Sequence, residues 1–441
     1  MQQKKVNVIG GGLAGCEAAY QLSKYGIPVR LYEMKPQKMT PAHSRLELAE
    51  LVCSNSLRSD RLSNAVGLLK QEMRKFDSLI MRAADETRVP AGGALAVNRE
   101  DFSAYVTKEL ERNGLIEIVR EEVVDLTAFD ADEIVIVAAG PLASAGLMNS
   151  VRTLTGDECL HFFDAAAPIV SARSIDMDKA FIASRYDRGN DYVNCPMTRE
   201  EYDVFYHALV GAECAPLKGF ENQEVFEGCM PVETMAGRGY ETLLFGPLKP
   251  KGLRDPKSDK RPYAVVQLRM EDAEGSMYNM VGFQTHLKFK EQQRVFGLIP
   301  ALAKAEFLRY GVMHRNTFLK SPDLLDKYYR LRNKPNIRFA GQITGVEGYV
   351  ESASSGLLCG QYVACECLGM PLPDFNDQTA IGALALHISG STSGNFQPMN
   401  INYGIMRPLD HKVRGKEERN LEISMRALTK VSEIIAQYHL K

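Results

Sequence analysis

A glycine-rich turn near the N-terminus constrains the fold of this chain more than any other feature of its sequence. Residues 5–9 (KVNVI) are short, apolar and β-branched, residues 10–15 (GGGLAG) form a GxGxxG pattern, and residues 16–25 follow with helical periodicity. Gly26 is typical of a helix that ends in a left-handed residue. A strand, a glycine turn and a helix in this order predict a dinucleotide-binding βαβ unit.

Each glycine of this turn has a physical task. Gly10 makes the tight turn, Gly12 lets the backbone approach a pyrophosphate, and Gly15 lets the helix pack closely on the strand. Glu33 stands 18 residues after Gly15, at the end of the next strand (27–32), and is predicted to accept hydrogen bonds from a ribose. A glycine turn without a ligand is the alternative, and this context argues against it. The predicted cofactor-binding residues of this region are Gly10, Gly11, Gly12, Leu13, Ala14, Gly15 and Glu33.

Two later segments favour FAD over NAD as the cofactor. In the stretch 132–139 (DEIVIVAA), the apolar residues after Glu133 do not alternate with polar ones, which predicts a parallel strand buried on both faces. Residues 336–341 repeat the strand-glycine pattern more than 300 residues after the first turn, and a helix is expected from residue 352 or 353. In flavoproteins built from two segments, such a late turn brings backbone N–H groups to the flavin. The residues predicted to contribute are Gly140, Gly341, Gln342, Gly345, Glu347 and Gly348.

The middle of the chain has a different character. Residues 176–315 are richer in aromatic side chains and in short alternating runs such as 263–269, with interruptions such as 247–252. We expect an α/β fold with a Rossmann-like, glutathione-reductase-like FAD-binding domain that is discontinuous (1–175 and 316–441). An α+β domain (176–315) is inserted into it. Residues 417–438 are predicted to form an amphipathic surface helix.

Composition limits the class of protein. With 441 residues, 45% hydrophobic and 24% charged, the chain resembles a soluble globular protein of two or three domains. Nine cysteines at irregular spacings predict no disulfide framework, and we expect a reducing cytoplasm. The sequence contains neither a signal-peptide core nor an apolar stretch long enough to span a bilayer, so no membrane association is expected. No metal site is predicted.

Positive charge is concentrated in the middle of the chain, although the net charge is only −2. Residues 249–261 contain six basic and two acidic side chains, and residues 284–334 contain eleven basic and four acidic ones. Two such runs favour a docking surface for a polyanion, while a solvated surface charge remains the alternative for each single residue. The candidate RNA-binding residues are Lys249, Lys251, Arg254, Lys257, Lys260, Arg261, Lys288, Lys290 and Arg294.

Two of the cysteines have unusual surroundings. Cys53 lies in LVCSNSL (51–57), among small side chains that form hydrogen bonds, and Cys229 lies in EVFEGCMPVE (224–233). The other seven show no polar constellation and are expected to be inert. Carboxylates such as Glu227 and Glu233 raise the pKa of a nearby thiol, so Cys229 would need activation by another group, which the sequence does not identify.

Five motifs together resemble one known family. They are GGGLAGCEAA (10–19), LVCSNSL (51–57), FEGCMPVE (226–233), MAGRGY (235–240) and AGQITGVEGY (340–349). The chain is similar over its whole length to the bacterial folate- and FAD-dependent tRNA (uracil-5-)-methyltransferases, the TrmFO family, which is related to the MnmG/GidA flavoproteins. The motifs that contain cysteine are far more specific than the dinucleotide fingerprint.

The resemblance implies methylation of carbon 5 of the T-loop uridine of tRNA. The carbon would come from 5,10-methylenetetrahydrofolate, and reduced FAD, regenerated by NAD(P)H, would supply the electrons. Cys229 matches the cysteine proposed to attack carbon 6 of the base, and Cys53 matches a second cysteine close to the flavin. The resemblance does not decide which cysteine attacks, whether the methylene group passes through the flavin, or which residues bind folate.

Three other functions remain as alternatives. A disulfide oxidoreductase would need a close cysteine pair beside the flavin, and the sequence contains none. A related flavoprotein that modifies the wobble uridine would differ in the tRNA position it changes. A non-enzymatic FAD-containing RNA-binding module would release no tritium from tRNA labelled in uracil.

Overall fold

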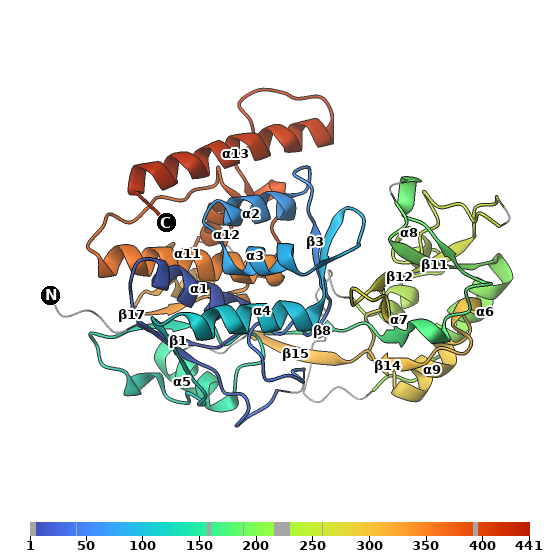
Figure 1. The fold of residues 1–441 in the computed structure, drawn as a ribbon, viewed down its shortest axis with the longest axis horizontal. Helices are drawn as coiled ribbons and strands as arrows, with labels where there is room; N and C mark the ends of the chain where they lie inside the picture. The colour runs from blue at the N-terminus through green and yellow to red at the C-terminus, as the bar shows by residue number, and fades with distance from the viewer. Residues whose placement is uncertain are drawn as a thin grey trace.

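The computed structural model describes residues 6–40, 42–156, 160–187, 189–215, 230–257, 259–390 and 396–441. Figure 1 shows two lobes side by side. The first lobe holds both ends of the chain, and the second contains a separate sheet formed by residues 169–309. Cys229 lies outside the described residues. The predicted domain boundaries stay a prediction, and the first strand of the second sheet already lies before residue 176.

The first lobe is built on a six-stranded sheet. Its strand order is β16 (Arg330–Leu331), β17 (Lys334–Phe339), β7 (Ile134–Val137), β1 (Val6–Ile9), β2 (Val29–Tyr32) and β6 (Ile116–Val119). The edge strand β16 is antiparallel to β17, and the other neighbours are parallel. Every residue of β1 and β7 is buried, as expected for central strands of a parallel sheet. The predicted α/β Rossmann-like fold is therefore confirmed.

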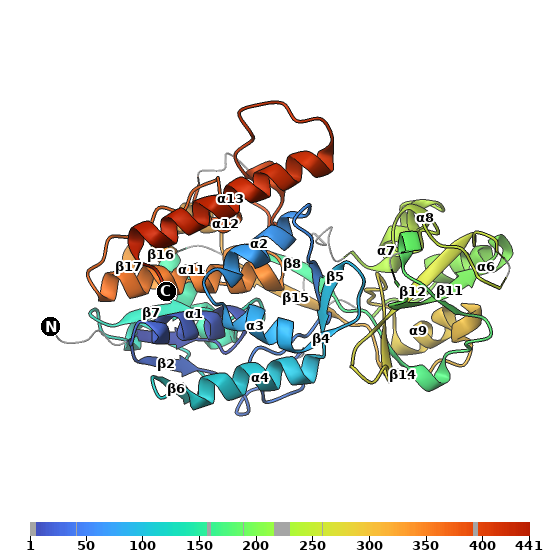
Figure 2. The same cartoon turned by 45° about the horizontal axis from the view of Figure 1, so that its top comes forward.

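Two helices from opposite ends of the chain pack tightly in this lobe. Helix α1 (Leu13–Lys24) follows the first glycine turn, and α11 (Tyr349–Cys367) follows the late one. A Cβ atom on Gly356 of α11 would overlap the carbonyl group of Ala14, so only glycine permits this approach. Figures 1 and 2 show α11 beside α1. The late turn is thereby fixed beside the first one.

This lobe contains further helices and a small sheet. They are α2 (Ala65–Arg74), α3 (Leu79–Glu86), α4 (Arg99–Arg112), α5 (Ala145–Thr155), α10 (Ser321–Leu324), α12 (Ala380–His387), α13 (Lys416–Tyr438) and a small sheet of β3 (Ser56–Ser59), β5 (Ala94–Val97) and β4 (Arg88–Val89). In α13, Ile423, Ala427, Val431 and Ile434 are buried at helical spacing. This one-sided burial agrees with the predicted amphipathic helix.

The second lobe contains an antiparallel sheet with helices packed on it. The strand order is β10 (Phe181–Ile182), β11 (Tyr192–Met197), β12 (Ala264–Met270), β13 (Met277–Met280), β9 (Ile169–Ser171) and β14 (Phe307–Arg309). Its helices are α6 (Arg199–Val210), α7 (Val232–Gly237), α8 (Thr242–Phe245) and α9 (Phe289–Phe296). A two-stranded ribbon of β8 (Leu160–Ala165) and β15 (Met313–Phe318) runs between the lobes. The cores of the two lobes are separate hydrophobic clusters.

Three local predictions differ from the structure. Residues 263–269 were expected to alternate between buried and exposed, but β12 is buried at every position except Met270. Helix α11 begins at Tyr349, three residues before its predicted start. The edge strand β6 was not predicted at all. The burial of β12 matters for function, because it places Gln267 and Arg269 inside the molecule.

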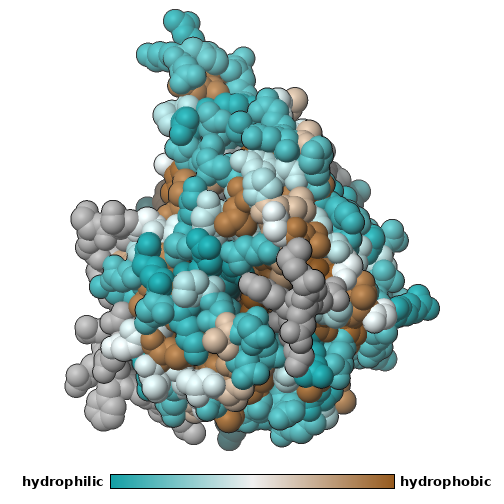
Figure 3. All heavy atoms as spheres, turned by 90° about the vertical axis from the view of Figure 1, so that its left-hand side faces the viewer, coloured by the Kyte–Doolittle hydropathy of each residue, from teal (hydrophilic) through white to brown (hydrophobic). Residues whose placement is uncertain are grey.

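None of the helices in the described ranges is both long and apolar enough to cross a bilayer. Figure 3 shows one face of the molecule, where hydrophilic residues predominate and hydrophobic ones form smaller areas between them.

Lys70 of α2 predicts a pH dependence of stability. Its side chain is fully buried, its ammonium group donates to the carbonyl oxygen of Ser59 at 2.6 Å, and burial lowers its pKa from 10.5 to about 7. Between pH 10 and pH 7 the unfolded chain therefore binds the Lys70 proton more readily, and stability falls as the pH falls. We expect Lys70→Met to flatten this dependence, measured as the change in urea midpoint between pH 10 and pH 7.

The exposed Lys75 provides the matched control for this test. Lys75→Met should keep the wild-type dependence on pH. If the urea midpoint of Lys70→Met changes between pH 10 and pH 7 by as much as that of the wild type, the buried Lys70 side chain is not the source of the pH dependence.

Candidate active site

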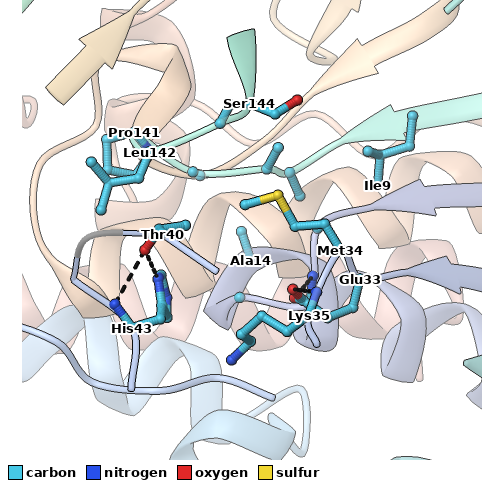
Figure 4. Close-up of a pocket in the computed structure, with 18 of the residues that line it drawn as sticks. Ile9, Ala14, Glu33, Met34, Lys35, Thr40, His43, Pro141, Leu142 and Ser144 are labelled. Carbon is cyan, nitrogen blue, oxygen red and sulfur yellow. Dashed lines mark hydrogen bonds between the residues drawn. The ribbon is translucent and has the colours of Figure 1, made fainter. Parts of the chain in front are cut away.

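A first cavity opens at the carboxyl ends of β1, β2 and β7, where a doubly wound sheet binds its ligand. Of the predicted cofactor-binding residues, those that line it are Gly10, Gly11, Gly12, Leu13, Ala14, Glu33, Gly140, Gly341 and Gln342. Figure 4 shows Glu33 and Ala14 on one side of this cavity and Pro141, Leu142 and Ser144 opposite them. The two glycine turns predicted from distant parts of the chain thus meet at one site.

The glycines of the first turn leave the backbone open towards the cavity. Gly10 has φ +110°, and a Cβ atom there would lie 2.5 Å from the carbonyl oxygen of Ala138. A Cβ atom on Gly12 would meet no atom within 4 Å, and the same holds for Gly140, whose φ is +70°. A phosphate group could therefore approach the backbone at Gly12 without displacing a side chain. This open cradle fits a dinucleotide.

Glu33 is held by backbone N–H groups on the floor of the cavity. Its carboxylate accepts from the N–H of Gly11 and from the N–H of Lys35, each at 3.0 Å, and it is only 8% exposed. Fixed in this way, Glu33 keeps acceptor capacity for a ligand hydroxyl group. The predicted contact with a ribose stays a prediction.

Two of the predicted glycines, Gly15 and Gly345, do not line the cavity and serve the fold instead. A Cβ atom on Gly15 would overlap the carbonyl oxygen of Gly10, so this glycine allows α1 to start close to the turn. A Cβ atom on Gly345, where φ is +86°, would lie 2.5 Å from the ring of Phe396. Both glycines therefore allow close packing around the turns instead of facing a ligand.

The loop after β2 contributes a pair of side chains that the sequence did not identify. The hydroxyl oxygen of Thr40 lies 2.5 Å from Nδ1 of His43, and both residues line the first cavity (Figure 4). Burial, and then the charge of Lys35, lower the pKa of His43, so its ring is neutral at neutral pH. No spacing rule applies to a loop of this kind, which is why sequence patterns missed the pair.

A second cavity of about 290 Å³ adjoins the first, and both lobes contribute to its walls. The two cavities share the lining residues Val52, Pro141, Leu142, Gln342 and Tyr349. Glu347 and Gly348 of the late turn line this second cavity. Asn279 also lines it, and its amide nitrogen is buried without a partner among the described residues. A ligand in the first cavity could extend into the second.

Cys53 lies in the wall of this second cavity. Its backbone N–H donates to the hydroxyl group of Tyr349 at 2.7 Å, and the N–H of Ser54 donates to the same oxygen at 3.2 Å. Burial raises the pKa of Tyr349 well above its usual value, so the phenol keeps its proton. Cys53 Sγ lies 3.6 Å from the carbonyl oxygen of Ala165. The thiol is thus fixed where the two lobes meet.

The small polar residues around Cys53 hold a buried arginine. Arg269 of β12 donates to the amide oxygen of Asn55 at 2.9 Å and to the hydroxyl oxygen of Ser54 at 2.8 Å. It lines the second cavity and is 7% exposed. The serine and asparagine of LVCSNSL therefore serve to orient a guanidinium group, a role that their pattern alone did not reveal.

Three guanidinium groups are bonded to the segment around Cys53. Arg99 donates to the carbonyl oxygen of Leu51 at 3.0 Å, Arg309 donates to that of Val52 at 2.9 Å, and Arg269 donates to the two side chains named above. Arg99 is paired with the carboxylate of Glu271 at 2.6 Å, which offsets one of the three charges. The remaining positive charge favours an anion in this part of the cavity.

A cluster of titratable groups lies beside this cavity in the second lobe. The carboxylate of Glu233 accepts from the hydroxyl group of Thr285 at 2.8 Å and from the N–H of His286 at 2.9 Å, and it lies 2.6 Å from Nδ1 of the His286 ring. Cys214 completes a group whose ligand atoms lie within 4.8 Å of one another and could hold a metal ion. Burial and then Glu233 raise the pKa of Cys214. Because both oxygens of Glu233 are already engaged, this cluster also works as a hydrogen-bonded brace.

Comparisons with known sequences give the family of this chain. A family model described as glucose inhibited division protein A matches residues 5–371. A methylenetetrahydrofolate–tRNA-(uracil-5-)-methyltransferase TrmFO from Acetivibrio thermocellus is 59% identical over 434 residues, which cover 98% of this chain and 99% of that protein. The chain belongs to the TrmFO family. A TrmFO from Listeria monocytogenes serotype 4b is 55% identical and covers 98% of this chain.

Solved structures agree on the fold. Aquifex aeolicus GidA, in one crystal form, superimposes with a TM-score of 0.73 at 16% identity, covering all of this chain and 74% of that one. A second crystal form of that protein gives a TM-score of 0.71. At this identity the likeness concerns the fold alone. The relation to GidA that the sequence motifs implied is confirmed.

The second cysteine motif of the TrmFO resemblance falls on the edge of the described chain. The described residues resume at Met230, which is buried, and the N–H of Val232 donates to the carbonyl oxygen of Gln284 at 2.7 Å. Gln284 lines the second cavity. His286, two residues further on, lies against Glu233, one of the two glutamates that flank Cys229 in the sequence. The role of Cys229 remains a prediction.

The candidate RNA-binding residues of this TrmFO-family chain lie in the second lobe, mostly exposed. The ammonium group of Lys257 donates to the carbonyl oxygens of Met177, Asp178 and Ala180, so it braces the fold. Lys288 pairs with Glu213 at 2.5 Å, and Arg294 pairs with Glu291 at 2.6 Å. Phosphate binding by these nine residues stays a prediction.

Proposed function

We propose that this chain methylates carbon 5 of the T-loop uridine of tRNA. The carbon comes from 5,10-methylenetetrahydrofolate, and FAD reduced by NAD(P)H provides the electrons. The observation that carries this proposal is a dinucleotide-type cavity that continues into a second cavity containing Cys53 and Arg269. Membership of the TrmFO family supports the choice of substrates. A cytoplasmic location, where tRNA is modified, is part of the same proposal.

The first cavity has the features that FAD needs. The open backbone at Gly12 and Gly140 would receive the diphosphate, and Glu33 would receive a ribose hydroxyl group. The shared residues Gln342 and Tyr349 would lie where the flavin enters the second cavity. When bound, FAD supplies the electron pair that turns a methylene group into a methyl group.

The residues of the chain account for the activation of the base. Carbon 5 of uracil is a poor nucleophile until a group adds to carbon 6, and a thiolate is well suited to this addition. We assign the addition to Cys229: a bond forms between its sulfur and carbon 6, and the electron pair of the double bond moves towards the base carbonyl. Arg269 is oriented to stabilise that negative charge. Carbon 5 then forms a bond to the methylene carbon, whose bond to the folate nitrogen breaks. Cys53 takes the proton from carbon 5, and reduction of the resulting exocyclic methylene group to a methyl group lets Cys229 leave carbon 6, which restores the double bond of the ring.

The substrate must enter as a single base. The second cavity lies between the lobes, and a uridine in a folded RNA loop reaches such a cavity only after it has been splayed out of the stack. Basic side chains on the second lobe would hold the RNA backbone meanwhile, each phosphate contact adding about 0.7–0.9 to the log–log salt slope.

Release of tritium from tRNA labelled at carbon 5 of uracil tests the proposal. We expect release that depends on methylenetetrahydrofolate and NADPH, and 5-methyluridine in the T-loop by mass spectrometry of nuclease fragments. An omission of methylenetetrahydrofolate is the control and should abolish both signals. A modified wobble position would favour the related wobble-uridine enzyme, and RNA binding without any release would favour a non-enzymatic module. Either outcome would overturn the proposal.

A further inference from the structure

A column of aromatic rings runs from the core of the second lobe to its surface. Phe283 and Phe296 are fully buried, with ring centroids 5.2 Å apart. Phe296 contacts Phe307 at 6.4 Å, Phe307 stacks on Tyr310 at 5.5 Å, and Tyr310 stacks on Phe289 at 4.6 Å. The column therefore ends at Phe289, the first residue of α9, which is 53% exposed.

The outer three rings are nearly parallel. The planes of Phe307 and Tyr310 differ by 8°, and those of Tyr310 and Phe289 by 17°. The two pairs in the interior meet at 79° and 35°. The hydroxyl group of Tyr310 accepts from the side-chain amide of Gln293 at 2.5 Å, which fixes the middle ring. A fixed stack with an exposed outer ring offers a flat face for one more ring.

This stack lies next to the second cavity. Tyr310 precedes Gly311, where a Cβ atom would lie 2.8 Å from the carbonyl oxygen of Ala166, and Ala166 lines that cavity. The side chain of Gln292 bonds both backbone groups of Gly311 at 2.8 Å and thereby ties α9 to the same wall. Phe289 therefore begins a helix that is bonded to the segment next to this wall.

The charges around Phe289 suit an anionic partner. Lys288 and Lys290 flank it in the sequence, and both are exposed. Lys288 is paired with Glu213, whereas Lys290 has neither a hydrogen bond nor an ion pair within the described part of the chain. An aromatic face beside basic side chains is the usual platform for an unstacked nucleobase.

We propose that an unpaired nucleobase of the RNA substrate stacks on Phe289 as the next ring of the column, while Lys290 contacts a neighbouring phosphate. This inference rests on the proposed function, because it takes RNA as the substrate. It assigns to the exposed ring a contact with the bases that surround the target uridine.

Binding of an unmodified tRNA transcript by Phe289 variants tests the inference. Loss of one stacked base weakens binding about 10-fold, which is the effect expected for Phe289→Ala, whereas Phe289→Trp should bind like the wild type. The log–log slope of affinity against salt should stay unchanged in Phe289→Ala and should fall by about 0.7–0.9 in Lys290→Ala. Phe245→Ala is the matched control, since Phe245 is 76% exposed in the same lobe and takes no part in the column. It should bind like the wild type.

The outcomes separate this inference from the proposed function. Wild-type affinity in Phe289→Ala, with T-loop methylation intact, would overturn the stacking role alone. Failure of the wild-type protein to bind tRNA would instead overturn the proposed function. If Phe289→Ala changed the oligomeric state by light scattering and left RNA affinity unchanged, the ring would be a contact between copies of the chain. Far-UV circular dichroism and bound flavin, both unchanged, would show that the variant is folded.

Discussion

Replacement of Gly15 by alanine is expected to give a protein that loses most of its bound flavin. A Cβ atom at this position would overlap the carbonyl oxygen of Gly10, which forms the tight turn under the first cavity. Either α1 moves away from the turn or the turn opens, and both changes displace the N–H groups that face the ligand. Overpacking of this kind costs about 1–3 kcal/mol. The ratio of flavin to protein absorbance in the purified variant measures the result.

Gly114 is the matched control for this substitution. A Cβ atom there would meet no atom within 4 Å, and its backbone is not in the left-handed region, so Gly114→Ala should keep its flavin. A Gly15→Ala protein with full flavin content and an unchanged thermal midpoint would contradict the assigned role of Gly15. Loss of flavin from both variants would point to a general loss of stability instead.

Replacement of Cys229 by alanine is expected to abolish T-loop methylation while flavin content stays normal. Without addition of a thiolate, carbon 5 of the uracil is not activated, and no other group of the chain is assigned to that step. We expect a loss of at least about 1,000-fold, because removal of a covalent nucleophile affects the reaction far more than removal of one hydrogen bond. Tritium release under single-turnover conditions is the measurement.

Cys214 supplies the control for the thiol. It lies in the same lobe, is exposed and sits beside Glu233 and His286, yet it has no role in the proposed reaction. Cys214→Ala should therefore methylate tRNA at close to the wild-type rate. Full methylation by Cys229→Ala would contradict the assignment of Cys229 as the nucleophile. Cys53 would then be the next candidate for this role. Equal loss in both variants would mean that the effect is not specific to Cys229, which would also contradict its assignment.

The sequence predicted the dinucleotide-binding lobe well because its constraints are local. The turn at residues 10–15 needs glycine for steric reasons that hold in any such fold, and β7 is uniformly apolar because both its faces are buried. Gly26 has φ +76°, as a left-handed helix end requires. Such features are visible in a single stretch of residues.

The second cavity could not be predicted in the same way because its contacts join distant segments. Arg269 ends a run with an alternating pattern, in which a charged residue is expected to face water. In the fold, Arg269 is buried and donates hydrogen bonds to Asn55 and Ser54, which lie more than 200 residues earlier in the chain. The stack of Phe289 on Tyr310 likewise joins a helix to the segment after a strand. Neither contact can be predicted from the periodicity of a single stretch of sequence.

The pairing of β7 with β17 has a consequence for synthesis of the protein. Val135 and Ile337 are direct neighbours in the sheet, so the ribosome must translate residues 138–333 before this edge of β7 finds its partner. At about 5–20 residues per second, the edge stays unpaired for roughly 10–40 s. The strands of the second lobe all lie within that interval and can pair first. The nascent chain thus carries an unpaired, apolar strand edge until the cofactor lobe closes, and such an edge is prone to pair with another chain.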